Sequence, residues 1–400
     1  MKLFKKLVTL FLVISASLAV MSGCVIVRDN GYSTQEVKIN VVDTNASTYN
    51  SLTEMLDAVR PSVLEIYAGQ ETATSYSAGS GVIFATSETG EGENKKTYYY
   101  VLTCHHVIDG MQAFMAKDIY GNEYKTLTLI GGDPESDIAV MRFCPKDETG
   151  TLTNNELSVA TIRRTNQTTE NYLKVGESVY AIGNPLGTLG GTVTQGIVSS
   201  TNREVVVEVK KMSLIQTDCA INSGNSGGGL FDAQGNLIGI VNAGYAGDIE
   251  GLNFAIPSDI AEDIAKQLLE QIDPQSGYGY VLNRARVMAV VESQVYGSYE
   301  LAVHDYSSNP FNPNSYATYI FGVKAGSIYG LAGLEYLDKL VSVQINDGAV
   351  YEVQSAQSLI SYFNSQTLSK GDVVKFVVIK NGATAQTSVS VTLPQYVYTI

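Results

Sequence analysis

The sequence predicts a mainly β protein with more than one domain. At 400 residues the chain is too long for one ordinary hydrophobic core, so two to three domains are expected. Between residues 80 and 256, short runs rich in Val, Ile, Thr and Tyr alternate with turns marked by Gly and Asn. Such runs are typical of β-strands in sandwiches and barrels. We therefore expect two packed antiparallel barrels with a site between them.

The N-terminus predicts an export signal. Three lysines within the first six residues precede an uncharged apolar stretch, 7–20, which is short for a membrane-spanning helix. The stretch ends at Met21-Ser22-Gly23-Cys24, which resembles a bacterial lipobox. We expect residues 1–23 to be a lipoprotein signal peptide and Cys24 to be acylated. An uncleaved signal anchor is the alternative.

The next elements lead into the first folded domain, expected at residues 51–273. Residues 24–50 are polar with scattered Val, Asn, Thr and Asp, which predicts a spacer. Ser51–Val59 is expected to form a short helix. A second helix is expected at Ser258–Ile272, because isoleucine and leucine recur on one of its faces and Asp273-Pro274 ends it.

Two adjacent histidines end a predicted strand. The run Tyr98–Cys104 is rich in aromatic and β-branched residues, and His105 and His106 follow it directly. Adjacent side chains at a strand end point to opposite sides, so only one of the two can face a given site. The remaining histidine, His304, stands far downstream and is expected in a turn or at the surface.

An acidic residue heads a second apolar run. Asp137 precedes the run 138–143 and follows a turn that contains Asp133. Asp133 stands before a proline, where an Asp side chain commonly bonds its own backbone, so Asp137 is the stronger candidate for a functional carboxylate. A catalytic histidine needs such a group to orient its ring.

The loop Gly224-Asn225-Ser226-Gly227-Gly228 is the most informative segment of the chain. Glycines on both sides of a serine allow a tight turn that leaves the Ser226 hydroxyl exposed. The N–H groups of Gly224 and Ser226 can then point at one spot, so we expect Gly224, Asn225 and Ser226 to form an oxyanion hole. By itself such a string is more often a plain turn. The interpretation therefore depends on a base and a carboxylate elsewhere in the chain.

The order and setting of these residues resemble the HtrA/Deg family of serine proteases. The frame Thr103–Val107 is similar to the Thr-x-x-His stretch of chymotrypsin-fold proteases, which selects His106, and the order His106, Asp137, Ser226 is that of this fold. Other matching stretches are Arg60–Val63, Gly79–Val82, Ala181–Gly187, Gly191–Ser199, Gln216–Asp218, Ala220–Asn222 and Asn253–Pro257. The resemblance implies a chymotrypsin-like double β-barrel protease domain in which Ser226 attacks, His106 transfers the proton and Asp137 orients His106.

The resemblance also implies a substrate pocket at Ala220, Ile221 and Asn222. In trypsin-like enzymes the residue six before the nucleophile forms the pocket floor, and here that residue is Ala220. An uncharged floor cannot compensate the desolvation of Lys or Arg, so we expect small or medium apolar side chains before the scissile bond. Asp248 and Glu250 lie in a loop that borders this pocket in the family. A side chain of this loop that points inward would admit basic residues.

The C-terminal part predicts a second domain. Residues 274–280 contain Pro, Gln, Ser and two glycines and are expected to be a linker. In residues 281–400, the stretches Gly330–Leu334 and Asp338–Val343 resemble a PDZ domain of bacterial proteases, with its helix expected at Ser355–Phe363. PDZ domains bind C-terminal peptides by adding a strand at a sheet edge. The carboxylate-binding loop is expected near Arg284–Val290, where the usual glycine pattern is missing.

Charge and cysteine content exclude several classes of protein. The formal net charge of −14 argues against nucleic-acid binding. Apart from Cys24, the chain has the widely spaced Cys104, Cys144 and Cys219, an odd number that does not predict a disulfide framework. Cys104 is expected to be a small core residue. With two of three histidines adjacent and no Cys-x-x-Cys pattern, neither a metal site nor a cofactor is expected.

Taken with the family resemblance, the sequence implies an extracytoplasmic serine endopeptidase of protein quality control. It is expected to be lipid-anchored at the cell membrane and to cleave unfolded or misfolded proteins through an acyl-enzyme. The alternative is a non-catalytic chaperone or peptide-binding sensor that uses the same groove and the PDZ domain. The presence of all three triad residues favours the enzyme. The resemblance suggests a homotrimer, although no residue of the sequence requires one.

Overall fold

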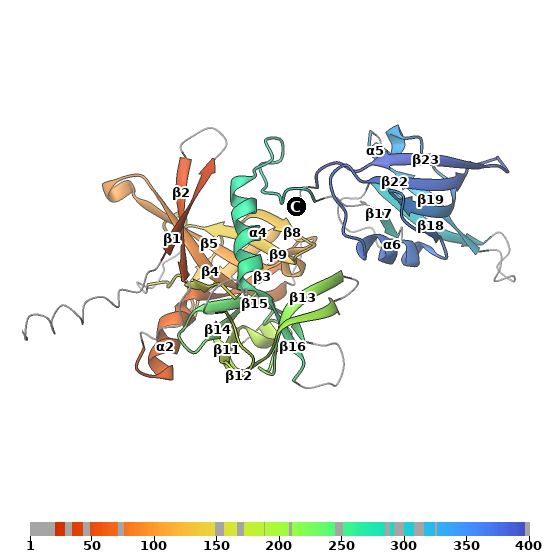
Figure 1. The fold of residues 1–400 in the computed structure, drawn as a ribbon. Helices are drawn as coiled ribbons and strands as arrows, with labels where there is room; N and C mark the ends of the chain where they lie inside the picture. Colours follow the sequence, from red (N-terminus) through yellow and green to blue (C-terminus); the bar gives the residue numbers. More distant parts are fainter. Residues whose placement is uncertain are drawn as a thin grey trace, which may run out of the picture. The chain divides into compact units, whose positions relative to one another are not determined.

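The chain folds into two compact units. The computed structural model describes residues 21–28, 34–42, 49–70, 76–148, 156–165, 172–187, 189–207, 210–244, 251–284, 289–291, 300–307, 316–324 and 326–396. Unit 1 consists of Met1–Arg203 with Ser213–Gly279, and unit 2 of Glu204–Met212 with Tyr280–Ile400 (Figure 1). The division after Gly279 falls within the predicted linker 274–280. The predicted signal peptide, 1–23, lies almost entirely outside the described residues.

The predicted spacer at residues 24–50 is wrong for much of its length. Strands β1 (Met21–Arg28) and β2 (Thr34–Val42) form an antiparallel hairpin, and β2 also pairs with β4. Along β2, the side chains of Val37, Ile39 and Val41 are buried. This alternation has the period of a strand with one covered face, and pairing with the first sheet buries it despite the polar residues between.

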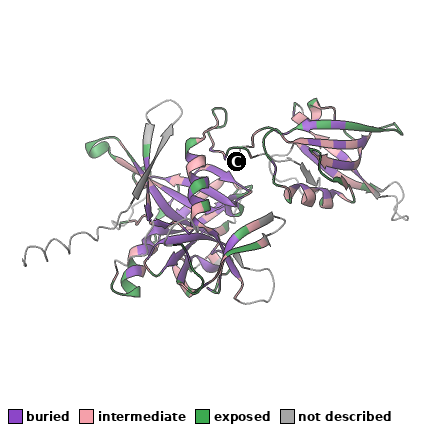
Figure 2. Cartoon of the chain, viewed as in Figure 1, coloured by how far each residue is buried: buried purple, intermediate pink, exposed green. Residues whose placement is uncertain are grey.

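The N-terminal half of unit 1 is an antiparallel sheet in the order β7-β6-β3-β4-β5-β9-β8. Buried apolar residues follow its strands, as the burial colouring shows (Figure 2). The strands are β3 (Val63–Gly69), β4 (Ser77–Thr89), β5 (Lys96–Cys104), β6 (Ala113–Lys117), β7 (Glu123–Tyr124), β8 (Thr128–Asp133) and β9 (Ile138–Phe143).

The C-terminal half of unit 1 is a closed barrel of six strands. Its order is β14-β11-β12-β13-β16-β15, and β15 pairs again with β14. The strands are β11 (Ser178–Gly183), β12 (Thr192–Val207), β13 (Lys210–Thr217), β14 (Gly229–Asp232), β15 (Leu237–Gly244) and β16 (Asn253–Pro257). The short strand β10 (Ile162–Arg163) pairs in parallel with both β15 and β2, and so joins the barrel to the first sheet.

Few helices accompany these strands. Helix α2 (Leu52–Val59) forms where it was predicted, and the Ser51 hydroxyl caps its N-terminus. Helix α3 (His105–Ile108) is a single turn after β5, and 3₁₀ turns occur at Arg60–Ser62, Gly92–Asn94, Pro145–Asp147 and Pro185–Gly187. Within the described ranges, no helix is long and apolar enough to cross a membrane.

Helix α4 (Ser258–Glu270) packs against strands of both halves of unit 1, including β8, β9, β15 and β16. It ends two residues before the predicted Ile272, because the chain turns there and Ile272 forms an isolated bridge with Gly279. Its buried face includes Ile264 and Leu268 as expected, whereas Ile260 is exposed.

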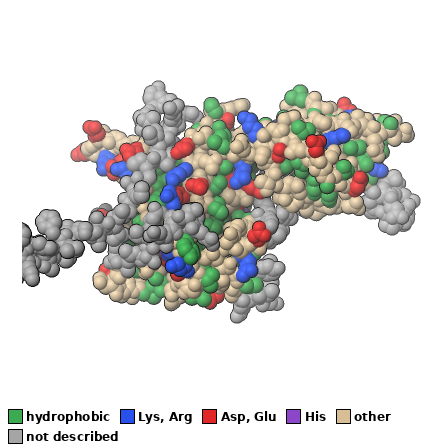
Figure 3. Space-filling view, in the orientation of Figure 1, with side chains coloured by type: hydrophobic (Ala, Val, Ile, Leu, Met, Phe, Trp, Pro, Cys, Tyr) green, Lys and Arg blue, Asp and Glu red, His purple; other side chains and the backbone are tan. Residues whose placement is uncertain are grey.

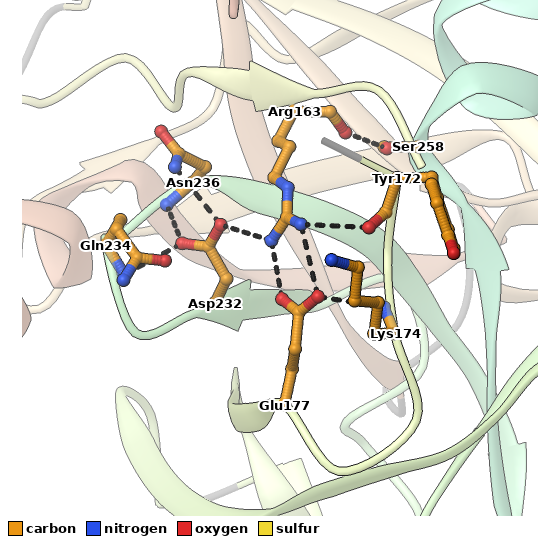
Figure 4. A network of polar contacts seen from close by, with 8 residues as sticks. All are labelled: Arg163, Tyr172, Lys174, Glu177, Asp232, Gln234, Asn236 and Ser258. Carbon is orange, nitrogen blue, oxygen red and sulfur yellow. Dashed lines mark hydrogen bonds and ion pairs between the residues drawn. The ribbon is translucent and has the colours of Figure 1, made fainter. Parts of the chain in front are cut away.

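A buried ionic network ties the barrel to α4 (Figure 4). The guanidinium of Arg163 in β10 donates to Glu177 at 2.7 Å and to Asp232 at 3.1 Å. The carbonyl of Arg163 accepts a hydrogen bond from Ser258 at the start of α4. Asp232 also accepts from the backbone of Asn236, in the turn that leads into β15. The network thus fixes the beginning of β15, a strand whose later residues reach the candidate active site.

Among its described residues, unit 2 contains a seven-stranded sheet and two helices. Its order is β17-β18-β19-β20-β22-β23, and β21 pairs with β20. The predicted helix is present as α6 (Ala356–Asn364), with Ser355 in a capping box at its N-terminus. The other elements are β17 (Ala289–Val291), β18 (Leu301–Ser307), β19 (Tyr316–Val323), α5 (Ile328–Leu331), β20 (Lys339–Ile345), β21 (Val350–Glu352), β22 (Val373–Ile379) and β23 (Gln386–Thr392).

Candidate active site

The candidate base and its candidate carboxylate are hydrogen-bonded. His106 Nδ1 lies 2.7 Å from Asp137 Oδ2, and the backbone N–H of His106 donates to Asp137 Oδ1 at 2.8 Å. The His106 side chain is 41% exposed, whereas that of Asp137 is only 12% exposed. Burial opposes ionisation of Asp137, but the hydrogen bonds and charge of His106 outweigh it and lower the pKa of this carboxyl. The pair is therefore an ionised carboxylate that holds a half-exposed imidazole.

Local structure places this pair. Cys104, the last residue of β5, is the register partner of Ile138, the first residue of β9, so His106 and Asp137 meet where the two strands end and begin. Asp137 has φ +55°, a left-handed conformation that is uncommon for a residue other than glycine. This backbone aims its carboxylate at α3 rather than along β9.

The three competing residues have other surroundings. Asp133 is buried and accepts hydrogen bonds from the backbone and hydroxyl of Ser136, within its own turn. His105 is buried, while its neighbour His106 faces outward. His304 lies in β18 of unit 2, with its ring centroid 5.0 Å from that of Phe321. The structure therefore brings His106 and Asp137 together and surrounds the competing residues with other groups.

Ser226 lies in a tight loop between β13 and β14. Its hydroxyl donates a hydrogen bond to the carbonyl oxygen of Asn242 at 2.9 Å. Gly227 has φ +85°, and a Cβ added there would lie 2.1 Å from the carbonyl oxygen of Ser80. Only glycine satisfies both conditions, so the loop depends on this residue to bring Ser226 against β4.

Asn242 in β15 connects the serine to the carboxylate, although no sequence pattern predicts its role. Its Nδ2 donates to Asp137 Oδ2 at 2.5 Å, while its carbonyl accepts from Ser226. The residue is buried, and β15 has a bulge between Val241 and Ala243. A bulge re-aims side chains at a strand end, which explains why periodicity alone did not reveal Asn242.

Ser80 in β4 is a second residue that sequence reasoning missed. It is fully buried, and its hydroxyl donates to the Gly224 carbonyl at 2.7 Å and accepts from the Asn184 N–H at 2.9 Å. Its backbone N–H donates to the Ser226 carbonyl at 2.8 Å. The string Gly79-Ser80-Gly81 was noticed only as a family match, because its partners lie far away in the sequence.

In the predicted oxyanion loop, both the carbonyl and the N–H of the Gly224–Asn225 peptide group are hydrogen-bonded. The Gly224 carbonyl is bonded to Ser80, and the Asn225 N–H, which belongs to the same peptide, donates to the Asn222 carbonyl at 3.0 Å. The N–H groups of Gly224 and Ser226 belong to the flanking peptides. Fixing the middle peptide therefore restricts the orientation of both expected donors.

The predicted pocket residues follow β13. Ala220 and Asn222 are exposed, Ile221 packs against the core of the barrel, and the Ala220 carbonyl accepts from the Thr194 hydroxyl at 2.9 Å. Asp248 and Glu250 lie outside the described residues, as does the side chain of Cys24. Cys104, Cys144 and Cys219 are buried thiols.

Known proteins that are similar to this chain are serine proteases. Residues 79–240 match the model of a trypsin-like peptidase domain. The chain is 35% identical over 243 residues to the serine protease Do-like HtrB of Bacillus subtilis (strain 168), covering 57% of this chain and 48% of that protein. It is 31% identical over 315 residues to the serine protease Do-like HtrA of the same organism, covering 77% and 62% respectively.

A third relative extends over most of the chain. The serine protease Do-like HtrA of Lactococcus lactis subsp. cremoris (strain MG1363) is 28% identical over 388 residues, which cover 90% of this chain and 86% of that protein. The chain spans about half the length of the first relative and less than two thirds of the second. The domain match and these relatives show that the chain is similar to trypsin-like serine proteases, as the sequence led us to expect.

Proposed function

We propose that this chain belongs to the HtrA/Deg family of trypsin-like serine proteases and hydrolyses peptide bonds with Ser226 as nucleophile. His106 acts as the base and Asp137 orients it. The observation that carries the proposal is the hydrogen-bonded His106–Asp137 pair, which Asn242 joins to Ser226. A nucleophile, a base and an orienting carboxylate in mutual reach are the requirement for this chemistry.

The geometry assigns a role to each ring nitrogen of His106. Because Asp137 holds Nδ1, Nε2 is the atom that takes the proton of Ser226. The Ser226 hydroxyl must leave the Asn242 carbonyl and turn toward the imidazole before it attacks. Attack on a peptide carbonyl gives a tetrahedral oxyanion, and its collapse releases the amine with a proton from His106. Water then hydrolyses the acyl-enzyme by the reverse transfers.

The N–H groups of Gly224 and Ser226 stabilise the oxyanion in this proposal, and Asn225 holds the turn between them. Removal of one such donor typically costs about 10²–10³ in kcat. The hydrogen bonds on the Gly224–Asn225 peptide support this assignment, because they fix the segment that links the two donors.

For substrates, we propose unfolded or misfolded proteins with an apolar side chain before the scissile bond. The exposed Ala220 offers no charge to a basic side chain. An extended, unfolded segment presents apolar side chains that a folded protein buries, so such a pocket favours unfolded chains. Protein quality control is the role that these preferences fit.

Unit 2 is proposed to be a PDZ-like domain that binds C-terminal peptides by strand addition. Helix α6 packs against β17 and β18, and β17 is an end strand of the sheet. Strand β17 pairs in parallel with β18, from Ala289 opposite Leu301 to Val291 opposite Val303. A peptide that adds at this edge either pairs with β17 and continues past its ends, or takes the place of β17 beside β18. The predicted carboxylate loop, Arg284–Val290, lies mostly outside the described residues.

An extracytoplasmic location, with a lipid on Cys24 as membrane anchor, is proposed from the lipobox and from relatives named periplasmic proteases. If Cys24 becomes the first residue, the hairpin keeps the pairs from Cys24 opposite Lys38 to Arg28 opposite Thr34. The lipid would then start beside the protease domain. A homotrimer is proposed from family resemblance alone.

On the face in Figure 3, acidic and basic side chains are interspersed.

Digestion of an unfolded model protein tests the proposal, with cleavage sites identified by mass spectrometry. We expect cuts mainly after Val, Ala, Ile, Leu or Thr and no cleavage by Ser226→Ala. The competing hypothesis is a non-catalytic chaperone or peptide sensor. Binding of the unfolded protein without cleavage by the wild type, under conditions that label no active serine, would favour that alternative.

A further inference from the structure

Three potential metal ligands converge at the back of the candidate active site. The Cys104 sulfur, a ring nitrogen of His106 and a carboxylate oxygen of Asp137 all lie within 4.8 Å of one another. Cys104 is fully buried at the end of β5, and its thiol is 3.3 Å from the Val241 carbonyl. Neither the base nor the orienting carboxylate needs a thiol here.

The ligand set matches the preferences of a soft divalent cation. Zn²⁺ binds Cys, His and carboxylate groups tetrahedrally, and sites with three protein ligands commonly keep water in the fourth position. Thiolate and carboxylate together would neutralise the metal charge. A neutral assembly has a lower desolvation cost in a buried site than an isolated ion. We propose that Cys104, His106 and Asp137 form an inhibitory site for Zn²⁺ or a similarly soft divalent cation.

Coordination requires a small local rearrangement. Tetrahedral bond lengths place the nitrogen and oxygen ligands about 3.3 Å apart, and the sulfur about 3.6 Å from either. The His106 Nδ1–Asp137 Oδ2 separation is 2.7 Å, so this hydrogen bond must open by roughly 0.6 Å. Cys104 releases its thiol proton to solvent as the sulfur–metal bond forms.

Neighbouring groups would support the bound metal. The Asn242 amide and the His106 backbone N–H already donate to the Asp137 carboxylate, and they orient it. The Cys104 thiol donates a hydrogen bond to the Val241 carbonyl, so the sulfur carries a proton before a metal binds. Metal binding therefore displaces the thiol proton of Cys104, and the proton on His106 Nδ1 moves to Nε2 as Nδ1 exchanges its hydrogen bond with Asp137 for the metal. The imidazole can then no longer accept the Ser226 proton in its required orientation.

The inhibitory consequence rests on the proposed protease function, whereas metal binding by itself does not. The experiment titrates the purified full chain with Zn²⁺ alone by calorimetry. It compares the wild type with Cys104→Ser, and with Cys144→Ser as a buried-cysteine control. Ser226→Ala separates binding from catalysis. Co²⁺ serves as a second probe, because a cobalt–thiolate bond gives a charge-transfer absorption band that requires no variant.

We expect one site per chain in the wild type, in Cys144→Ser and in Ser226→Ala. In Cys104→Ser the affinity falls by at least about 10–100-fold, the loss typical of removing an outer-shell partner alone, and the cobalt–thiolate band is lost. In the wild type, Zn²⁺ inhibits peptide cleavage over the same concentration range in which it binds, and Cys104→Ser retains activity in Zn²⁺ that silences the wild type. If Cys104→Ser fails to fold, Cys104→Ala replaces it.

Two results would overturn the inference: equal Zn²⁺ affinity of the wild type and the Cys104 variants, or no cobalt–thiolate band in the wild type. Failure of the proposed function looks different. In that case the wild type binds Zn²⁺ through Cys104 but cleaves no protein with or without metal.

Discussion

The ionic network around Arg163 allows a strong test of how the fold supports the site. The Arg163 side chain is 1% exposed, as is that of Asp232, and that of Glu177 is 25% exposed. Replacing Arg163 by Met removes the cation but keeps an unbranched side chain of similar length. The two carboxylates then lose their shared partner in a place that water reaches poorly.

Breaking a buried ion pair by removing one partner typically costs about 3–5 kcal/mol. Because burial already raises the pKa of Asp232 despite its bonds to Asn236 and Arg163, this carboxylate is poorly placed to stay charged alone. For a domain of this size, such a loss corresponds to a fall in Tm of roughly 6–20 °C. Urea unfolding followed by circular dichroism measures the free-energy change, and a thermal scan measures the fall in Tm.

Arg164→Met is the matched control. Arg164 is 37% exposed and pairs with Glu262, which keeps Lys266 as a second partner at 2.6 Å. We expect this neighbouring substitution to cost about 1 kcal/mol or less. Adding Asp232→Asn and Glu177→Gln to Arg163→Met is expected to recover part of the loss. Equal destabilisation by the two arginine substitutions would refute the reasoning.

The remaining predictions concern the site, the pH dependence and the specificity. Ser80→Ala is expected to lower kcat about tenfold to hundredfold with little change in KM, because the oxyanion loop loses its tie to β4. The control is Ser62, a buried serine whose hydroxyl donates to the Val59 carbonyl. Ser62→Ala is expected to lower stability but to leave kcat unchanged. Burial opposes ionisation of Glu262, but bonds from Arg164 and Lys266 lower its pKa below 4.5. The wild type is therefore expected to be more stable than Glu262→Gln at neutral pH, and this difference should disappear as the pH falls through that lowered pKa. Urea unfolding at several pH values measures the difference. Peptide libraries are expected to give broad preference among apolar residues before the cut, and a map dominated by Lys and Arg would contradict the uncharged pocket.

Local patterns predicted much of the fold. Helices α2 and α6 begin after serines whose hydroxyls cap them, which is a signal carried by a few adjacent residues. The hairpin of β1 and β2 was missed because its alternation is mixed with polar residues and its partner strand β4 lies far along the chain. The end of α4 was also misplaced, since a tertiary bridge between Ile272 and Gly279 determines it.

In the candidate site, too, local patterns predicted some residues, whereas others are recognised only from long-range contacts. His106, Asp137 and Ser226 stand in recognisable local frames, and the structure brings the first two into contact. Asn242 and Ser80 have no such frame, because their importance comes from hydrogen bonds to residues about a hundred positions away or more. Cys104 was interpreted as a core residue, which its burial supports, but only the folded chain reveals its distance from His106 and Asp137.

The most direct test of the central claim is covalent labelling of the folded protein by a serine-directed fluorophosphonate, with the modified residue identified by mass spectrometry. We predict one label, on Ser226, that is lost in His106→Ala while the variant keeps the wild-type circular dichroism spectrum. No labelling of the folded wild type, or equal labelling of wild type and His106→Ala, would contradict the account.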